Sequence, residues 1–434
     1  MNTSNSGMRI MILGSGGREH ALAWIINQSP LCSELYVAPG NPGTSLIGSN
    51  CDVHPNDFQS IGQLVLEKKI DLIVVGPEEP LVLGIADYFS AREDLKHVML
   101  IGPGKSAARL EGSKAFAKDF MKRHGIPTSA YKSFGESDIL EAKAFISSLK
   151  PPYVIKADGL AAGKGVSICQ NLNEANLVLE EMLLNKKFGK ASSTVVVEEF
   201  LNGIELSVFA ITDGSHYLML PAAKDYKRIG ENDTGPNTGG MGAVSPVTFA
   251  DADFLEKVET RIVLPTIKGL QTENIPYCGF IFFGLMNVDG NPFVIEYNVR
   301  LGDPEAEAIL PRIESDFTAI LVSAAKGSLE KHTIEVSSDY AATIILASGG
   351  YPGEYPKGKV VKGINQIKNS HVFYAGLTGE ADLPVTNGGR VLAVTSLAAT
   401  LPDALEKSYQ SASLINFDSM YFRCDIGRDL LKYL

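Results

Sequence analysis

The chain has 434 residues, 45% hydrophobic and 21% charged, and its 39 basic and 50 acidic residues give a formal net charge of −11. This composition is typical of a folded protein of about three domains, at roughly 150 residues each. No apolar run reaches the ~18 residues that a membrane-spanning helix needs. The acidic balance argues against a general binder of nucleic acid or anionic membrane, because such proteins carry net positive surfaces.

The cysteines indicate the cellular compartment. There are five, they are scattered along the chain, and none forms a CxxC pair. This pattern predicts neither a disulfide framework nor a zinc site, and it fits a reducing cytoplasm. Residues 1–7 are polar and lack the apolar segment of an export signal, so we expect a short disordered leader and a cytoplasmic protein.

The first predicted elements form a strand followed by a helix. Residues 8–13 are apolar, and a glycine-rich turn over 14–20 leads into a helical pattern. Further strands are expected at 34–38, 71–75 and 98–101, with helices between them. This alternation predicts an open parallel α/β sheet of Rossmann type, in which ligands bind at the carboxyl ends of the strands.

The middle of the chain predicts a different kind of sheet. A helix over 113–124 precedes a strand at 153–156, a glycine-rich loop at 157–165 and a strand at 166–168, which together read as a hairpin. The other expected features are a strand at 194–198, a long functional loop at 224–246, paired strands at 280–288 and 292–297, and helices up to about 327.

The last hundred residues alternate short strands with turns. We expect a strand at 341–346, a hairpin at 387–389 and an amphipathic helix at 403–415. A small mixed β/α domain at the C-terminal end follows from this pattern.

The N-terminal glycine turn predicts an anion site. Backbone amides at Gly16 and Gly17, with the cation of Arg18, can hold a single phosphate at a helix N-terminus. A purely structural glycine turn is the alternative. NAD is disfavoured because Glu19 stands where the dinucleotide fingerprint has its third glycine. Glu78, which follows Pro77 at a strand end, either contacts the same ligand or is solvated.

The glycine-rich loop at 157–165 is a candidate cover for a polyphosphate. It is not a P-loop, because its spacing is one residue short and a strand follows it instead of a helix. Flanked by Lys156 and Lys164, it can still lay amides and ammonium groups over phosphates. An ordinary glycine-rich turn is the alternative.

A strand end near residue 200 is a candidate nucleoside site. The segment Glu198, Glu199, Phe200 and Leu201 offers main-chain groups for adenine, and Glu205 offers a carboxylate for ribose. Solvated strand-end glutamates are equally common, so this signal is weak by itself.

A polar strand face predicts a metal site. In a strand, Glu296, Asn298 and Arg300 share one face, which provides two hard oxygen ligands for Mg²⁺ and a guanidinium for a transferring phosphoryl group. Asp303 and Glu305 add carboxylates in the next turn, some of which cap the following helix. The chain has no HExxH or GxSxG motif, so zinc hydrolysis and serine nucleophiles have no support.

Four stretches, taken in order, resemble the ATP-grasp ligases, and within them the phosphoribosylamine-glycine ligase family of de novo purine synthesis. The resemblance covers nearly all residues from Met8 onward. The stretches lie at 14–22, 156–165, 233–242 and 300–305.

The resemblance implies a reaction and an architecture. ATP would phosphorylate the carboxylate of glycine, and the amine of 5-phosphoribosylamine would displace phosphate to give glycinamide ribonucleotide, with Mg²⁺ or Mn²⁺ as the cofactor. The expected fold is a multidomain α/β and α+β chain acting as a monomer. Its domains are expected at 8–112 for the substrate-binding α/β domain, 113–328 for the ATP-grasp domain with a mobile lid at about 129–200, and 329–434 for the C-terminal domain.

The resemblance also implies roles for individual residues. Those implied for ATP are Lys114, Lys156, Gly159, Gly163, Lys164, Gly165, Glu198, Glu199, Phe200, Leu201 and Glu205. Those implied for the substrates are Gly16, Gly17, Arg18, Glu19, Pro77, Glu78, Asn237, Thr238, Gly239, Gly240, Met241, Gly302, Asp303, Pro304 and Glu305. Those implied for catalysis are Asp225, Lys227, Arg228 and Arg300, with Glu296 and Asn298 as metal ligands.

Two residues depart from the family pattern, and three other functions stay open. Tyr226 and Tyr374 stand where the family commonly has histidine. The alternatives are a carboxylating ligase that acts on aminoimidazole ribonucleotide, an oxidoreductase that binds NAD tightly at 14–17, and a nucleotide-binding regulator without turnover.

Overall fold

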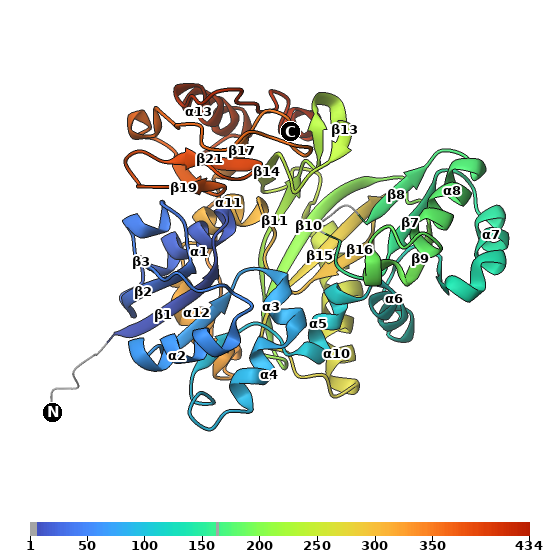
Figure 1. Ribbon diagram of the computed structural model, residues 1–434, viewed down its shortest axis with the longest axis horizontal. Coiled ribbons are helices and arrows are strands. Elements are labelled where there is room, and N and C mark those ends of the chain that lie inside the picture. The colour runs from blue at the N-terminus through green and yellow to red at the C-terminus, as the bar shows by residue number, and fades with distance from the viewer. Residues whose placement is uncertain (1–6, 162–164) are drawn as a thin grey trace.

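The computed structural model describes residues 7–161 and 165–434. Residues 1–6 of the expected leader, and Gly163 and Lys164 of the expected phosphate cover, lie outside the described residues. Figure 1 shows the N-terminal part in blue and the C-terminal part in red on one side of the molecule, with a smaller sheet and its helices projecting on the other. The predicted fold class is confirmed.

The N-terminal part is the predicted open parallel sheet. Its five strands lie in the order β3-β2-β1-β4-β5, and all four residues of β4 are buried, as expected for a sheet covered on both faces. The strands are β1 (Met8–Gly14), β2 (Cys32–Pro39), β3 (Ser49–Asn50), β4 (Leu72–Val75) and β5 (Met99–Ile101). The helices are α1 (Gly17–Ile26), α2 (Phe58–Lys68), α3 (Glu78–Leu83), α4 (Ile85–Ser90) and α5 (Lys105–Gly112).

The projecting part is an antiparallel sheet of four strands in the order β6-β9-β7-β8. The predicted hairpin is confirmed, because β7 and β8 pair antiparallel from Tyr153 with Cys169 to Lys156 with Val166. The elements are α6 (Lys114–Arg123), β6 (Tyr131–Gly135), α7 (Ile139–Ser148), β7 (Tyr153–Ala157), β8 (Val166–Cys169), α8 (Leu172–Leu183) and β9 (Thr194–Glu199).

An eight-stranded sheet in the order β16-β15-β10-β11-β14-β17-β21-β18 joins the middle of the chain to its C-terminal part. The strands are β10 (Ile204–Thr212), β11 (Tyr217–Asp225), β14 (Gly242–Ser245), β15 (Gly279–Val288), β16 (Asn291–Asn298), β17 (Tyr340–Ala347), β18 (His371–Tyr374) and β21 (Arg390–Ala398). The helices are α9 (Ala252–Val258), α10 (Leu264–Thr272), α11 (Glu305–Ile309), α12 (Phe317–Ala325) and α13 (Leu401–Leu414). The predicted hairpin of β15 and β16 is confirmed, with Asp289 and Gly290 at positive φ in its turn.

Two predictions of local structure were wrong. The segment 224–246 is not one loop, because it holds the end of β11, the small hairpin of β12 (Arg228–Gly230) and β13 (Thr234–Asn237), and strand β14. The hairpin at 387–389 does not form: β20 (Val385–Thr386) pairs with β19 (Leu377–Thr378), while β21 joins β17 and β18. In the first case short strands with weak local patterns form within the segment, and in the second β21 pairs with the distant β17.

Within the described ranges, none of the helices combines the length and the apolar character that crossing a membrane requires. All five cysteines are free.

Candidate active site

Strand β16 carries the polar face that the sequence predicted. Tyr297 and Val299 are buried in the core at 2% and 1% exposure, whereas Glu296, Asn298 and Arg300 alternate with them and are half-buried. Because alternate side chains of a strand share a face, Glu296 and Asn298 lie on the face of β16 away from the core. Arg300 lies two residues beyond the end of β16, and the alternation of burial continues to it.

Glu296 is an ionised carboxylate among lysines. Burial raises the pKa of this carboxyl, but the ammonium groups of Lys227 and Lys156, followed by that of Lys114, outweigh burial and hold the pKa below its ordinary value. Among residues 7–161 and 165–434, neither Glu296 nor Asn298 makes a side-chain hydrogen bond or ion pair. Both oxygen donors are therefore open to a ligand, and a carboxylate with an amide oxygen on one strand face fits a hard divalent cation.

Glu198 is placed differently from the predicted adenine contact. Its side chain is buried between two lysines, with Lys156 Nζ 2.9 Å from Oε1 and Lys118 Nζ 2.8 Å from Oε2. Burial raises the pKa of the Glu198 carboxyl, and the two ammonium groups bring it below its ordinary value. The side chain thus orients Lys156. The exposed Glu199 ends β9, and the half-buried Phe200 and Leu201 continue the chain beyond it.

Lys118 is a functional residue that sequence reasoning missed. Burial lowers its pKa to about 8, against the opposing effect of Glu198. Its ammonium also donates to Thr128 Oγ1 (2.7 Å) and Ser129 Oγ (2.8 Å). A single lysine on an amphipathic helix has no local signal that separates it from a solvated one.

Lys114 and Lys156 are linked through the end of strand β7. The carboxylate of Asp158 accepts hydrogen bonds from Ser113 Oγ (3.0 Å) and the Ala115 amide (2.7 Å) at the start of α6. Lys114 Nζ lies 3.4 Å from the carbonyl oxygen of Gly159. The start of α6 and the end of β7 therefore hold their lysines near each other.

A close backbone approach explains the glycine at 159. Its amide donates to Ala191 O at 3.0 Å, and a Cβ there would lie 2.9 Å from Ala191 Cα. At Gly165, a Cβ would lie 2.8 Å from that of Ala161. Both glycines thus have a packing reason in addition to the predicted phosphate contact.

Lys227 joins the carboxylates of the site. Its ammonium forms an ion pair with Glu205, the predicted ribose ligand. Burial raises the pKa of the nearby Asp225 to about 7, with Lys227 opposing and Glu305 adding to the rise. Glu305 accepts a hydrogen bond from Ser207 Oγ at 2.9 Å. Lys227 is therefore the cation shared by the predicted ribose and catalytic groups.

Arg300 connects β16 to the N-terminal part. Its guanidinium lies 3.6 Å from a carboxylate oxygen of Glu78, the residue after Pro77, and 3.1 Å from Oε1 of Glu111. Glu111 also accepts the Val299 amide at 2.7 Å. Arg300 Nε is buried and makes no hydrogen bond in the described part of the chain, and it is this nitrogen that lies 3.6 Å from Glu78.

The N-terminus of α1 does not present the open anion site that the sequence predicted. The carboxylate of Glu19 accepts the Gly16 amide (2.6 Å) and Arg18 Nε (2.6 Å), and Arg18 Nη1 donates to Leu301 O (3.1 Å). The Arg18 amide is bound to the carboxylate of Asp303. The Gly16 amide and the Arg18 side chain are thus engaged by Glu19 in the same turn, and Arg18 also by a backbone carbonyl 283 residues away in sequence.

The turn 302–305 packs against this helix start. Arg390 Nη1 lies 2.9 Å from Asp303 Oδ1 and also donates to Asp303 O (2.7 Å) and Gly239 O (2.8 Å). A Cβ at Gly240 would lie 2.4 Å from Pro304 Cδ, and one at Gly302 would lie 2.3 Å from a carboxylate oxygen of Glu305. Arg390, which the sequence did not single out, joins two predicted substrate loops.

Glu307 is a second residue that the sequence did not reveal. It is fully buried, and neither carboxylate oxygen has a hydrogen-bond partner among the described residues. A Cβ at Gly17 would lie 2.3 Å from Glu307 Oε1. Gly17 is thus required by this packing.

The loop 237–242 is ordered by backbone contacts. Thr238 donates to Lys227 O through both its amide (2.7 Å) and its hydroxyl (2.8 Å), and Asn237 pairs with Arg228 in the β12–β13 hairpin. Met241 is fully buried in the core, and the prediction that it belongs to a substrate-binding loop stays a prediction.

Arg228 and Tyr374 lie at the margins of the site. Arg228 Nη1 donates to the exposed Gly235 carbonyl (2.7 Å) and does not reach the lysine cluster. The amide of Tyr374 donates to His20 Nδ1 (2.8 Å) and its carbonyl accepts from Asn41 (2.8 Å), so Tyr374 fastens the C-terminal part to the N-terminal part.

One compact group of metal-type ligands lies elsewhere among the described residues. Ligand atoms of Asp213, His216 and Glu330 lie within 4.8 Å of one another, at the end of β10 opposite Glu205. His216 and Glu330 are exposed. Asp213 already accepts the amides of Ser215 (2.8 Å), His216 (2.7 Å) and Leu329 (3.1 Å), so we assign no metal to this group.

Comparisons with known proteins cover the whole described architecture. Three family models match, described as the phosphoribosylglycinamide synthetase N domain (residues 8–111), ATP-grasp (A) domain (112–306) and C domain (341–429). A phosphoribosylamine–glycine ligase of Chlorobaculum tepidum is 44% identical over 431 residues, which are 98% of this chain and 100% of the relative. One of Vibrio cholerae is 45% identical over 427 residues, 97% of this chain and 98% of the relative.

A solved structure supports the same relationship. The crystal structure of a phosphoribosylamine–glycine ligase from Thermotoga maritima has a TM-score of 0.83 and 35% identity, and the match covers 96% of this chain and 100% of that chain.

Proposed function

Because the chain belongs to the phosphoribosylglycinamide synthetase family, we propose that it ligates glycine to 5-phospho-D-ribosylamine with ATP in de novo purine synthesis. The products are glycinamide ribonucleotide, ADP and phosphate, so the chain is a carbon–nitrogen ligase. Glycine oxygen first attacks the γ-phosphorus, and ADP leaves. The amine then attacks the glycyl carbonyl carbon, and the carbon–oxygen bond breaks as phosphate departs.

The observation that carries the proposal is the open, ionised Glu296 beside Asn298 within a group of lysines. Glu296 and Asn298 would hold Mg²⁺ or Mn²⁺, which would supply positive charge to neutralise the phosphates of ATP. Lys114 and Lys156 bind the phosphates of ATP, and Lys156 is oriented for this by its ion pair with Glu198. These cations favour the transfer because charge spreads over the phosphoryl oxygens in the transition state.

Lys227 and Arg300 are the residues proposed to bind glycine and the acyl phosphate. Lys227 lies between Glu205 and Asp225, and the guanidinium of Arg300 is held beside Glu78 and Glu111. In the proposal they align the glycine carboxylate and stabilise the acyl phosphate as it forms. No residue forms a covalent bond with a substrate, which agrees with the absence of a nucleophile motif in the sequence.

The phosphoribosylamine is proposed to bind where the N-terminal part meets the turn 302–305. Glu78 and Asp303 present carboxylates there, and carboxylates suit the hydroxyl and amine groups of this substrate. Arg18 acts through its partners, because its guanidinium holds Glu19 and the Leu301 carbonyl.

We further propose the domain division 8–112, 113–328 and 329–434, with a lid at about 129–200 that closes over ATP. The five free cysteines support action in the reducing cytoplasm. We also propose that the enzyme acts as a monomer.

The oxidoreductase alternative loses its support at the glycine turn. The Glu19 side chain fills the space beside Gly16 and the end of β4, where a Cβ at Gly76 would lie 2.1 Å from Glu19 Oε1. A dinucleotide pyrophosphate needs both that space and the amide that Glu19 occupies.

The test is a product assay with Mg-ATP, glycine and freshly prepared 5-phosphoribosylamine. We expect ADP and glycinamide ribonucleotide in equal amounts, the latter identified by mass, with neither formed when glycine is omitted. ADP release that does not depend on glycine, or an ATP-bound protein that forms no product, would refute the proposed function.

A further inference from the structure

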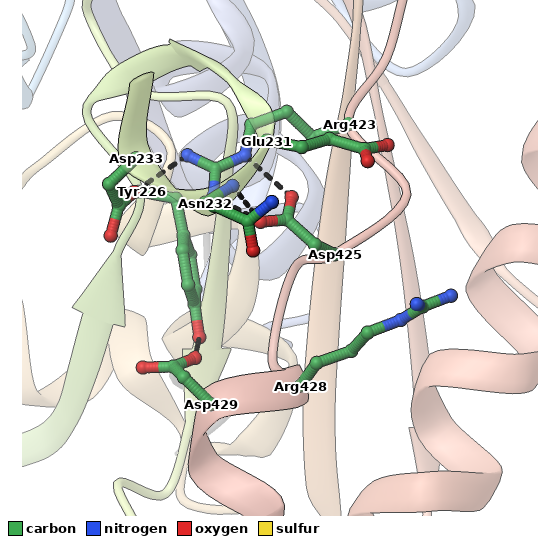
Figure 2. A pocket seen from close by; sticks show the side chains of 8 residues that line it. All are labelled: Tyr226, Glu231, Asn232, Asp233, Arg423, Asp425, Arg428 and Asp429. Carbon is green, nitrogen blue, oxygen red and sulfur yellow. Dashed lines mark hydrogen bonds and ion pairs between the residues drawn. The ribbon is translucent and has the colours of Figure 1, made fainter.

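The C-terminal segment 421–429, named here the C-terminal clamp, grips the β12–β13 hairpin next to the candidate site. A pocket of about 340 Å³ lies between them. Figure 2 shows the side chains that line it. They are Tyr226, Glu231, Asn232, Asp233, Arg423, Asp425, Arg428 and Asp429.

Arg423 is the centre of the clamp. Its side chain is 1% exposed, and its guanidinium forms a fork on Asp425 through Nε (2.8 Å) and Nη2 (2.7 Å). Nη1 reaches across to Asp233 Oδ1 (2.8 Å) and to the carbonyl of Arg228 (3.0 Å). Asp425 in turn accepts the amide of Asn232 at 2.7 Å. The buried guanidinium of Arg423 thus holds the hairpin at the Arg228 carbonyl and at Asp233. Figure 2 shows the contact with Asp233.

Tyr226 fastens the root of the hairpin to the same segment. Its hydroxyl donates to Asp429 at 2.6 Å, and its ring lies 3.7 Å from Lys224 Nζ and 5.4 Å from Arg423 Cζ. The ring is almost completely buried. Tyrosine therefore has a structural task here that points away from the substrates.

The residue after Tyr226 points the other way. Lys227 forms its ion pair with Glu205 in the candidate site, whereas the side chain of Tyr226 enters the clamp. Neighbouring side chains of an extended chain lie on opposite faces, so fixing Tyr226 and the Arg228 carbonyl fixes the direction of Lys227.

We propose that Arg423 is a positioning residue for the ligation. It touches no substrate, and it acts by holding the β12–β13 hairpin so that Lys227 meets the acyl phosphate in the required orientation. This inference rests on the proposed function of Lys227. It assigns a task in the reaction to the C-terminal part of the chain, 195 residues from the backbone group that it holds.

The experiment compares Arg423→Lys with the wild-type enzyme. Lysine keeps the charge but cannot present a fork to several acceptors. We expect kcat to fall by at least ~10-fold, because even a small misplacement of a catalytic group slows the reaction strongly. The equilibrium affinity for ATP should stay within about twofold, because the clamp does not touch Lys114 or Lys156. Hydrogen exchange of the amides in 228–237 should become faster.

The matched control is Arg428→Lys, a change in the same pocket at an exposed arginine whose side chain makes no hydrogen bond or ion pair within the described ranges. It should leave kcat and exchange unchanged. If Arg423→Lys does not fold, Asp233→Ala removes the exposed hydrogen-bond partner of Arg423 and is judged by the same criteria. A folded variant with unchanged kcat and exchange overturns the proposal. If the wild type forms no glycinamide ribonucleotide, the proposed function fails, and the exchange data still decide whether Arg423 holds the hairpin.

Discussion

At the scale of single residues, some polar side chains of the candidate site have a protein partner and others have none among the described residues. Glu198, Glu19 and Arg18 are engaged by other side chains, whereas Glu296 and Asn298 are not. A carboxylate that is ionised and lacks a protein partner is available for a cation. The first prediction therefore concerns Asn298, where the chain offers a matched pair of variants.

Asn298→Asp keeps a hard oxygen donor and is expected to retain activity within about threefold, whereas Asn298→Leu loses ~100-fold in kcat because the oxygen is removed. Steady-state ligation rates with saturating substrates are the measurement. Equal losses in both variants would show that the residue is needed for packing instead of for binding a cation.

Glu307 gives a prediction about pH. Burial, with an added effect of Asp303, raises the pKa of this carboxyl well above its ordinary value. In the folded state Glu307 keeps a proton that it loses near pH ~4.3 in the unfolded state. Its contribution to the free energy of unfolding is therefore fully present in acid, and it decreases as the pH rises from the unfolded-state pKa toward the folded-state pKa. Glu307→Gln does not titrate. Above pH ~5, the free energy of unfolding of Glu307→Gln minus that of the wild type should therefore increase by up to ~1.4 kcal/mol per pH unit.

The measurement is denaturant unfolding at several pH values, with the exposed Glu380→Gln as the control. A difference between Glu307→Gln and wild type that stays constant with pH would contradict a protonated Glu307.

At the scale of elements, the site depends on how strand ends meet helix starts. Asp158 follows β7 and binds the first turn of α6 through Ser113 and Ala115. Removing its carboxylate should loosen Lys114 relative to Lys156. We expect Asp158→Ala to raise the KM for ATP about tenfold, equivalent to ~1.4 kcal/mol, with the KM for glycine nearly unchanged.

The control for this variant is Asp119→Ala. It removes an exposed carboxylate from the same helix, one that accepts a hydrogen bond from the Tyr131 hydroxyl. Initial rates at varied ATP and varied glycine separate the two effects. If both KM values rose together in Asp158→Ala, the link would serve general stability and not the ATP site.

Local patterns predicted the elements whose partners are near in sequence. The β7–β8 and β15–β16 hairpins and the alternation of Glu296, Asn298 and Arg300 could be predicted from residue spacing. Strand β14 could not, because it pairs with β17 about a hundred residues later. The buried ion pair of Lys118 with Glu198 was missed for the same reason, since it joins a helix to a distant strand.

At the scale of the whole molecule, the N-terminal and C-terminal parts lie together on one side of the middle of the chain (Figure 1). Arg300 binds Glu78 and Glu111 of the N-terminal part, Arg390 of the C-terminal part binds Asp303, and Tyr374 binds His20. The candidate site is therefore assembled from all three parts. The glycine turn, read alone, suggested an open phosphate site because residue spacing does not show that Glu19 turns back onto Gly16 and Arg18, or that Leu301 and Asp303 come from far along the chain to pack there.

In the proposed function, the enzyme joins glycine to 5-phosphoribosylamine by way of a glycyl phosphate that is formed with ATP. The most direct test uses glycine labelled with oxygen-18 in both carboxylate oxygens and follows the label by mass spectrometry of the released phosphate. The account predicts that each phosphate carries one labelled oxygen and that the other stays in the amide of glycinamide ribonucleotide. Phosphate without label, formed together with product, would contradict transfer of the phosphoryl group to glycine.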